Sequence, residues 1–170
     1  GLTGGLTYTY EVSALSLAGE SDRSVTMASP TSPVQVSGVA STAQTTGSIT
    51  LSWSAPSASD AGNGASGYMV YRNDGVGGTE MSTVGYDGSS SDTTSGTISG
   101  LVGGREYSFV VSALNRGGAG DMSDVYSKST SPAAPTALQS TLQTTTSITL
   151  SWAAPVAATG GADVSGYILY

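Results

Sequence analysis

Carboxylates are the side chains of this sequence with the clearest capacity for chemistry. The segment DGSSSD places Asp87 and Asp92 five residues apart, and SDAGNG offers Asp60 and Asn63. Hard oxygen donors of this kind bind Ca²⁺, but neither segment matches the twelve-residue calcium loop that ends in Glu. We therefore interpret both segments as solvated polar loops rather than as metal sites.

Catalysis would need further groups that the chain lacks. Two carboxylates about 5 to 10 Å apart suffice for glycoside hydrolysis, but the acids of this chain fall mainly in loops and turns, and no pattern predicts a cleft. The chain has no Cys and no His, which excludes thiolate nucleophiles, Cys/His zinc sites and imidazole bases. Lys128 is the only lysine, so a Ser–Lys pair has little support. We expect no enzyme activity, no cofactor and no metal.

The charge of the chain excludes two classes of partner. Five basic and 12 acidic residues give a net charge of -7 and a pI of about 4.1, so no basic surface is available for nucleic acid. The same sign disfavours anionic membranes, and no apolar run approaches the roughly 20 residues of a spanning helix. We expect neither nucleic-acid binding nor membrane insertion by this segment.

The segment NRGGAGD, residues 115–121, is a polar, glycine-rich loop between two expected strands. Glycine-rich loops that bind phosphate usually lead into a helix N-terminus, which is not predicted here. A mobile turn is the favoured interpretation, and Asn115, Arg116 and Asp121 form the candidate interaction loop.

The elements that must position these loops repeat every 99 residues. GLTGGLTYTYEVSAL at the start of the chain matches GLVGGREYSFVVSAL from residue 100, and TTGSITLSWSAP from residue 45 matches TTTSITLSWAAP from residue 144. SGYMVY at residues 66–71 recurs as SGYILY at residues 165–170. The period exceeds that of solenoid repeats, so each unit is expected to be a whole domain.

Alternation of apolar residues predicts β-strands within the unit. In SITLSW, Ile49, Leu51 and Trp53 share one face of a strand. In YSFVVSA the inward set is Tyr107, Phe109, Val111 and Ala113, with Ser108, Val110 and Ser112 on the opposite, exposed face. A third strand, GYMVYR, puts Tyr68 and Val70 on one side and Met69 and Tyr71 on the other, and NDG after it supplies a hairpin turn; Ile98 and Val125 mark two further strands. These short strands and frequent turns predict an all-β sandwich of two antiparallel sheets.

The aromatic residues are assigned to packing rather than to ligand binding. Alternation places Trp53 in the core, where it would not serve as a platform for sugars or proline-rich peptides. Tyr71 and Tyr86 are the aromatics expected to be partly exposed, and packing on the sheet surface is favoured for both.

The unit resembles the fibronectin type III domain, a seven-stranded immunoglobulin-like sandwich, over the whole chain. Trp53 and Trp152 match the family's buried second-strand tryptophan, each followed by Ala-Pro, and Tyr68 and Tyr167 begin the third strand. The segments from Leu2 to Tyr8 and from Leu101 to Tyr107 match the spacing of the family's Leu-x-Pro-Gly-Thr-x-Tyr corner, with Gly-Gly in place of Pro-Gly. The resemblance implies that Tyr8 and Tyr107 bond back to upstream backbone.

The structural core is thus expected to contain Trp53, Tyr68, Leu101, Tyr107, Trp152 and Tyr8. Arg-Gly-Asp, which some members carry in the loop at 115–121, is absent, so integrin binding is not carried over.

The repeat divides the chain into three parts. We expect residues 1–30 to be the end of a first fibronectin type III-like domain, residues 31–131 to be a complete domain, and residues 132–170 to be the beginning of a third. The Pro-containing entries SPTSPVQV and TSPAAPTAL are short, which favours a semi-rigid rod.

Three functional hypotheses remain open. The first is a structural or adhesive array that forms an extracellular or cell-surface rod, coat or filament, with self-association or with other extracellular proteins or glycans as partners, and with Val110 or Leu114 as exposed lateral contacts. The second is a spacer within a secreted polysaccharide-active enzyme, and the third is the ligand-binding ectodomain of a receptor-like protein.

Overall fold

The computed structural model describes residues 1–56, 64–155 and 164–170. Every regular element among these residues is a β-strand. In chain order the strands are β1 (Thr7–Tyr10), β2 (Leu15–Ser16), β3 (Gly19–Glu20), β4 (Met27–Pro30), β5 (Ser37–Gln44), β6 (Ser48–Ser54), β7 (Gly67–Arg72), β8 (Thr83–Gly88), β9 (Ser95–Ser99), β10 (Glu106–Asn115), β11 (Gly118–Ala119), β12 (Tyr126–Ser129), β13 (Thr136–Gln143) and β14 (Ile148–Ala153). No helix among these residues is long and apolar enough to cross a membrane.

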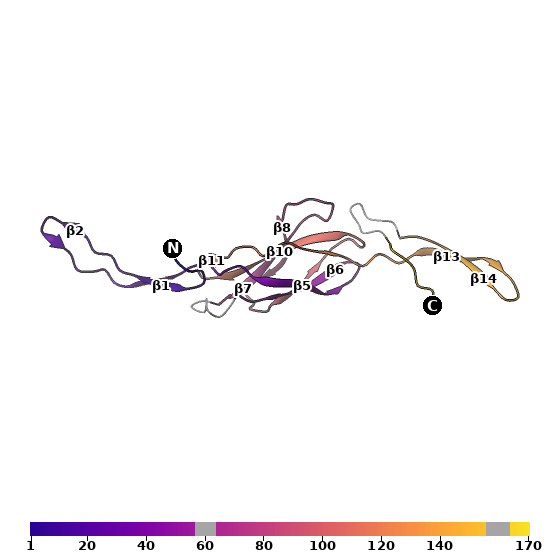
Figure 1. The fold of residues 1–170 in the computed structure, drawn as a ribbon, viewed down its shortest axis with the longest axis horizontal. Helices are drawn as coiled ribbons and strands as arrows, with labels where there is room; N and C mark the ends of the chain where they lie inside the picture. Colours follow the sequence, from indigo (N-terminus) through magenta and orange to yellow (C-terminus); the bar gives the residue numbers. More distant parts are fainter. Residues whose placement is uncertain (57–63, 156–163) are drawn as a thin grey trace.

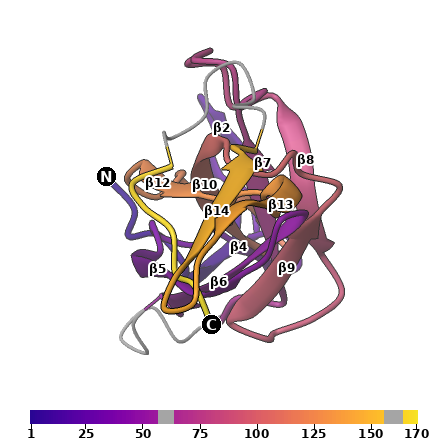
Figure 2. The same cartoon turned by 90° about the vertical axis from the view of Figure 1, so that its right-hand side faces the viewer.

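The central part of the chain folds into two antiparallel sheets that pack face to face. One sheet has the strand order β5–β6–β9, and the other has the order β11–β10–β7–β8, with β12 also paired to β10. A view along the long axis shows β5, β6 and β9 in one layer and β7, β8 and β10 in the other (Figure 2). The predicted all-β, sandwich-type fold is confirmed.

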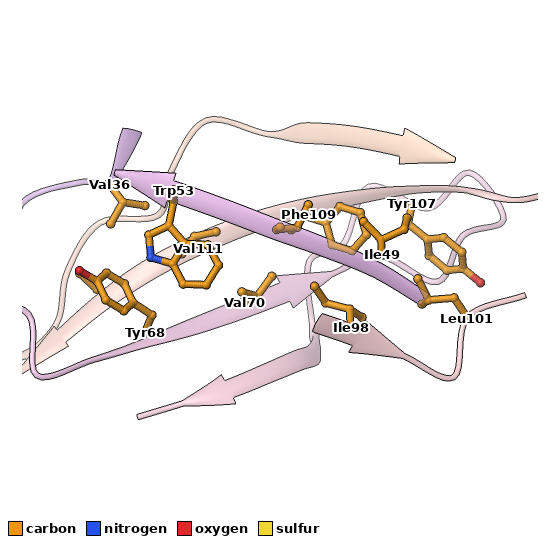
Figure 3. Close-up of a cluster of buried hydrophobic side chains, with 12 residues drawn as sticks. Val36, Ile49, Trp53, Tyr68, Val70, Ile98, Leu101, Tyr107, Phe109 and Val111 are labelled. Carbon is orange, nitrogen blue, oxygen red and sulfur yellow. The ribbon is translucent and has the colours of Figure 1, made fainter. Parts of the chain in front are cut away.

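The core lies between these two sheets and follows the predicted alternation on β6 and β7. Ile49, Leu51 and Trp53 are buried on β6. The residues between them, Thr50 and Ser52, are half-buried. At one end of the core Trp53 lies beside Tyr68, with ring centroids 5.3 Å apart, and at the other end Tyr107 lies beside Leu101 (Figure 3). The remaining buried members of the cluster are Val36, Val70, Ile98, Phe109, Val111 and Ala113.

The prediction that β10 buries one face was wrong. Val110 is only 4% exposed and Ser112 only 2%, although both lie on the face that points away from the core. The cause is position, because β10 is a central strand with β7 on one side and β11 and β12 on the other. Tyr71 is the register partner of Val110, so its ring stands beside Val110 on that outer face. Val110 is therefore not an exposed lateral contact, and Leu114 is half-buried.

The connection between β7 and β8 is a ten-residue loop instead of a tight hairpin turn, although its first residues are the predicted NDG. The Asn73 side-chain oxygen accepts bonds from the Gly75 amide at 3.2 Å and from the Ser108 amide at 3.0 Å. Gly75 has a φ of 75°, which favours glycine. A Cβ at Gly75 would also run into the Tyr107 ring, so the loop packs directly against this core residue.

Hairpins on either side of the central sandwich repeat its pairings with the offset of 99 residues (Figure 1). Thr7 pairs with Pro30 as Glu106 pairs with Ser129, and Leu15 pairs with Glu20 as Leu114 pairs with Ala119. At the other end, β13 and β14 follow the register of β5 and β6, including both of its irregularities. The molecule is elongated, with the central sandwich between these two hairpin regions.

Trp152 and Tyr8 are less covered than the equivalent residues of the central sandwich. Trp152 is 37% exposed and packs against Tyr167 with ring centroids 5.3 Å apart, whereas Trp53 is 5% exposed. Tyr8 is half-buried. The physical reason is that β1–β4 and β13–β14 are two-stranded pairs, and no second sheet packs on them among the described residues.

Candidate functional site

The candidate interaction loop, residues 115–121, is a hairpin that leaves the end of β10 and returns through β11. The Asn115 side-chain oxygen accepts a bond from the Gly117 amide at 2.7 Å, which closes the turn. Gly118 follows with a φ of 111°, a conformation that favours glycine. The Ser112 hydroxyl donates to the carbonyl of Gly120 at 2.8 Å and ties the returning chain to the strand.

This loop lies against residues 31–35 of the same chain. The Asn115 side-chain amide donates to the Thr31 carbonyl at 3.0 Å, and the Ser32 hydroxyl donates to the Gly117 carbonyl at 3.1 Å. The Gln35 side-chain amide donates to the carbonyl of Met122 at 2.8 Å. The sequence favoured a mobile turn here, but the loop is bound at several points.

Arg116 and Asp121 are both exposed, and the structure does not join them. Among the described residues the single ion pair is that of Arg23 and Glu11, at 3.4 Å. Of the three candidate residues, Asn115 is therefore bonded to residues 31–35, the linker that leads into the central sandwich, while Arg116 and Asp121 face solvent. Their interaction with an external partner stays a prediction.

Among the described residues, the acidic side chains do not gather as metal ligands. The Asp87 carboxylate accepts a bond from the Ser89 amide at 3.0 Å, and hydrogen bonds from Ser89 lower the pKa of Asp87. Burial raises the pKa of the Tyr68 phenol, and the nearby charge of Asp92 raises it further. No group of three or more acidic residues in the described ranges could hold a metal ion, and Asp60 and Asn63 lie outside those ranges.

The half-buried aromatics Tyr71 and Tyr86 lie on opposite faces of their sheet. Tyr86 packs against the core, 6.4 Å from Trp53 between ring centroids, and its ring covers Gly96 and Gly88. A Cβ at Gly96 would lie 2.7 Å from that ring. Tyr71 stands beside Val110 on the outer face. Tyr86 thus packs on the inner face, and neither ring is an exposed platform.

Tyr107 and Tyr8 form the same corner in two places. The Val102 amide donates to the Tyr107 hydroxyl at 2.9 Å, and the Thr3 amide donates to the Tyr8 hydroxyl at 2.7 Å. Arg72 adds a cation–π contact, with its guanidinium carbon 5.4 Å from the centre of the Tyr107 ring. Both tyrosine hydroxyls fix the turn before a strand, which is a role in packing.

A hollow that combines polar and apolar groups lies under the loop after β7. It has a volume of about 370 Å³, is open to solvent, and is lined by Asn73, Met81, Glu106, Ser108 and Val125 together with residues 77–79. Glu106 is its one charged group. A nucleophile with an adjacent base, which hydrolytic catalysis would need, is not among these residues.

Comparison with known proteins identifies the fold. The model of the fibronectin type III domain matches residues 32–129. Chitinase A1 of Niallia circulans is 37% identical over 82% of this chain and 19% of its own length, and Exoglucanase B of Cellulomonas fimi is 30% identical over 100% of this chain and 16% of its own length. The chain thus spans less than a fifth of the length of either relative.

Solved structures agree on the fold. The FN1–FN3 domains of chicken CNTN1 match with a TM-score of 0.50 and 18% identity, over 76% of this chain and 44% of theirs. Domains A168–A170 of titin match with a TM-score of 0.50 and 22% identity, over 62% of this chain and 36% of theirs. At these identities the likeness concerns the fold alone.

Proposed function

Because the chain belongs to the fibronectin type III family, we propose that it is a non-catalytic, extracellular spacer of a polysaccharide-active protein. One observation carries this proposal: the strand pairings of one sandwich recur end to end with an offset of 99 residues. Serial units of one fold set a distance between whatever they connect. Strand pairings that repeat in this way favour a role in holding other domains apart over a role as an enzyme with one active site.

The relatives support the polysaccharide context. Both are proteins whose names denote action on polysaccharides, and the part that matches this chain is less than a fifth of each. The side chains of the repeated motifs are used for packing, as with Trp53 in the core and Tyr107 in its corner. A spacer between other domains is consistent with all three observations.

Hydrolysis and binding assays on insoluble polysaccharide test the proposal. The purified chain is incubated with chitin and with crystalline cellulose, and both released reducing sugar and retained protein are measured, with an active chitinase as the positive control. A spacer releases no sugar above buffer and stays in the supernatant. Sugar release would identify an enzyme, and tight retention would identify a carbohydrate-binding module, so either result rejects the proposal.

A coat or filament is the second candidate, and the outer sheet face favours it. Val84 is 49% exposed and is the register partner of Tyr71, and Val125 is 62% exposed beside Ser108 of β10. Apolar side chains gathered on one sheet face can bury themselves against a second copy. Sedimentation velocity at increasing protein concentration separates the candidates, because a spacer keeps a constant sedimentation coefficient and a self-associating array does not.

A further inference from the structure

Residues 31–33, which enter the central sandwich, are held from the upstream side by the Gly4–Gly5 corner. The Gly5 amide donates to the Ser32 carbonyl at 2.7 Å, and the Thr31 amide donates to the Leu6 carbonyl at 2.9 Å. The Thr31 hydroxyl also donates to the Thr3 carbonyl at 2.8 Å. This upstream half of the junction recurs 99 residues later, where the Thr130 hydroxyl donates to the Val102 carbonyl at 2.7 Å.

The downstream half of the junction is the loop at residues 115–121. Asn115 bonds to Thr31 and Gly117 bonds to Ser32 as described above, so the loop holds these two residues from the opposite side. Pro33 is buried in this arrangement, whereas Pro132, 99 residues later, is exposed. The burial of Pro33 therefore accompanies the contact with the loop.

Close approach depends on two glycines of the loop. A Cβ at Gly117 would lie 2.7 Å from the carbonyl carbon of Thr31, and a Cβ at Gly120 would lie closer still to the Pro33 carbonyl oxygen. Both obstacles are backbone atoms, which cannot rotate away as a side chain can. Neither glycine has a positive φ, so what these positions require is the absence of a side chain.

The first copy of the loop, residues 16–22, shows whether the hairpin itself requires glycine at these two positions. It carries Ser16, Ala18 and Ser21 where the second copy has Asn115, Gly117 and Gly120. It nevertheless forms the same hairpin, with the Ser21 amide bonded to the Ala14 carbonyl at 2.9 Å as Gly120 is bonded to Ala113 at 2.8 Å. The hairpin therefore tolerates alanine and serine, and the glycines serve the contact with the linker.

We infer that the loop at residues 115–121 is an intramolecular docking surface whose partner is the backbone of residues 31–33. Docking fixes the direction in which the preceding hairpin region leaves the central sandwich, so the two cannot turn freely about the linker. The inference rests on the proposed function for its purpose, since a spacer with fixed joints sets an angle as well as a distance. It also accounts for Asn115, whose side chain is directed to the linker and not to an external ligand.

Spin-label distance measurements on the whole chain test this inference. The chain has no native cysteine, so labels at Thr9→Cys in β1 and Ser99→Cys in β9, both exposed positions, report on the two sides of the junction. The parent pair should give one narrow distance distribution. Gly117→Ala combined with Gly120→Ser, the residues of the first copy, should widen that distribution about twofold or more, since neither side chain can face the linker at its present distance.

The matched control is Gly47→Ala, because a Cβ there would meet nothing closer than the Leu101 carbonyl oxygen at 3.8 Å. Its distribution should equal that of the parent. A broad parent distribution, or a double variant as narrow as the parent, would overturn the inference. If near-ultraviolet circular dichroism shows that the double variant has lost its fold, Asn115→Ser decides, with widening expected and an unchanged width contradicting it. Polysaccharide assays do not enter this test, so failure of the spacer proposal would be recognised separately.

Discussion

Trp53 extends from β6 into the space between the two sheets and packs against two aromatic rings of the opposite sheet, Tyr68 of β7 and Tyr86 of β8. Its ring lies 5.3 Å from Tyr68 and 6.4 Å from Tyr86 between centroids, and its side chain is almost fully buried. Offset and tilted aromatic pairs of this kind add to the free energy of burial. The indole nitrogen has no hydrogen-bond partner among the described residues, so the contribution of Trp53 comes from apolar contact.

Replacing this residue should destabilise the central sandwich strongly. Trp53→Ala is expected to lower the free energy of unfolding by about 3 to 5 kcal/mol, since it removes a buried aromatic side chain and leaves a cavity. Urea unfolding followed by circular dichroism measures the change. Trp152→Ala is the matched control, because Trp152 stands in the same sequence motif but is 37% exposed, and it should cost much less. Equal losses would show that the burial of Trp53 is not what stabilises the fold.

Tyr68 gives the central sandwich a sensitivity to alkaline pH. Burial and then the charge of Asp92 raise the pKa of Tyr68 above its ordinary value of 10.0, so the folded state favours the neutral phenol. The resulting stability is fully present below about pH 10 and is lost as the pH rises through the folded-state pKa. Tyr68→Phe should therefore lose less stability than the parent between about pH 9 and pH 12.

Thermal unfolding across this pH range makes the comparison, and Tyr10→Phe, at an exposed position, controls for the removal of one phenol. Parallel losses in the parent and in Tyr68→Phe would contradict the role given to the Tyr68 hydroxyl.

At the scale of elements, the Tyr86 ring of β8 covers two glycines, Gly88 of the same strand and Gly96 of β9. Because the ring occupies the place of a Cβ, Gly96→Ala should force the ring away and destabilise the central sandwich by about 1 to 3 kcal/mol. Chemical unfolding measures the change, with Gly47→Ala, at an open position of the β5–β6 turn, as the control. A Gly96→Ala variant as stable as the control would mean that Tyr86 moves aside without cost.

The elements also divide what the sequence could predict from what it could not. The alternation of Ile49, Leu51 and Trp53 identified β6 and its inner face, since a half-buried strand has a period of two residues. The same rule failed at Val110, because burial of an outer face depends on neighbouring strands that lie far away in the sequence. The contact of Asn115 with Thr31 spans 84 residues and follows no local pattern. A signal was nevertheless present, because Gly117 and Gly120 replace Ala18 and Ser21 of the first copy.

At the scale of the whole molecule, repetition is the dominant feature. Corner bonds to Tyr8 and to Tyr107 have nearly the same length, and Thr31 and Thr130 hold equivalent junctions. Each hairpin region continues the long axis of the central sandwich (Figure 1). Units that follow one another along one axis make the molecule long, and a spacer needs length.

Small-angle X-ray scattering of the 170-residue chain tests the central claim most directly, because it reports shape and mass together. An extended spacer predicts a pair-distance distribution with an early maximum and a long tail, and a scattering mass that stays monomeric as the concentration rises. A symmetric distribution typical of a compact particle would contradict extension along one axis. A mass that grows with concentration would contradict the spacer role and favour the self-associating array.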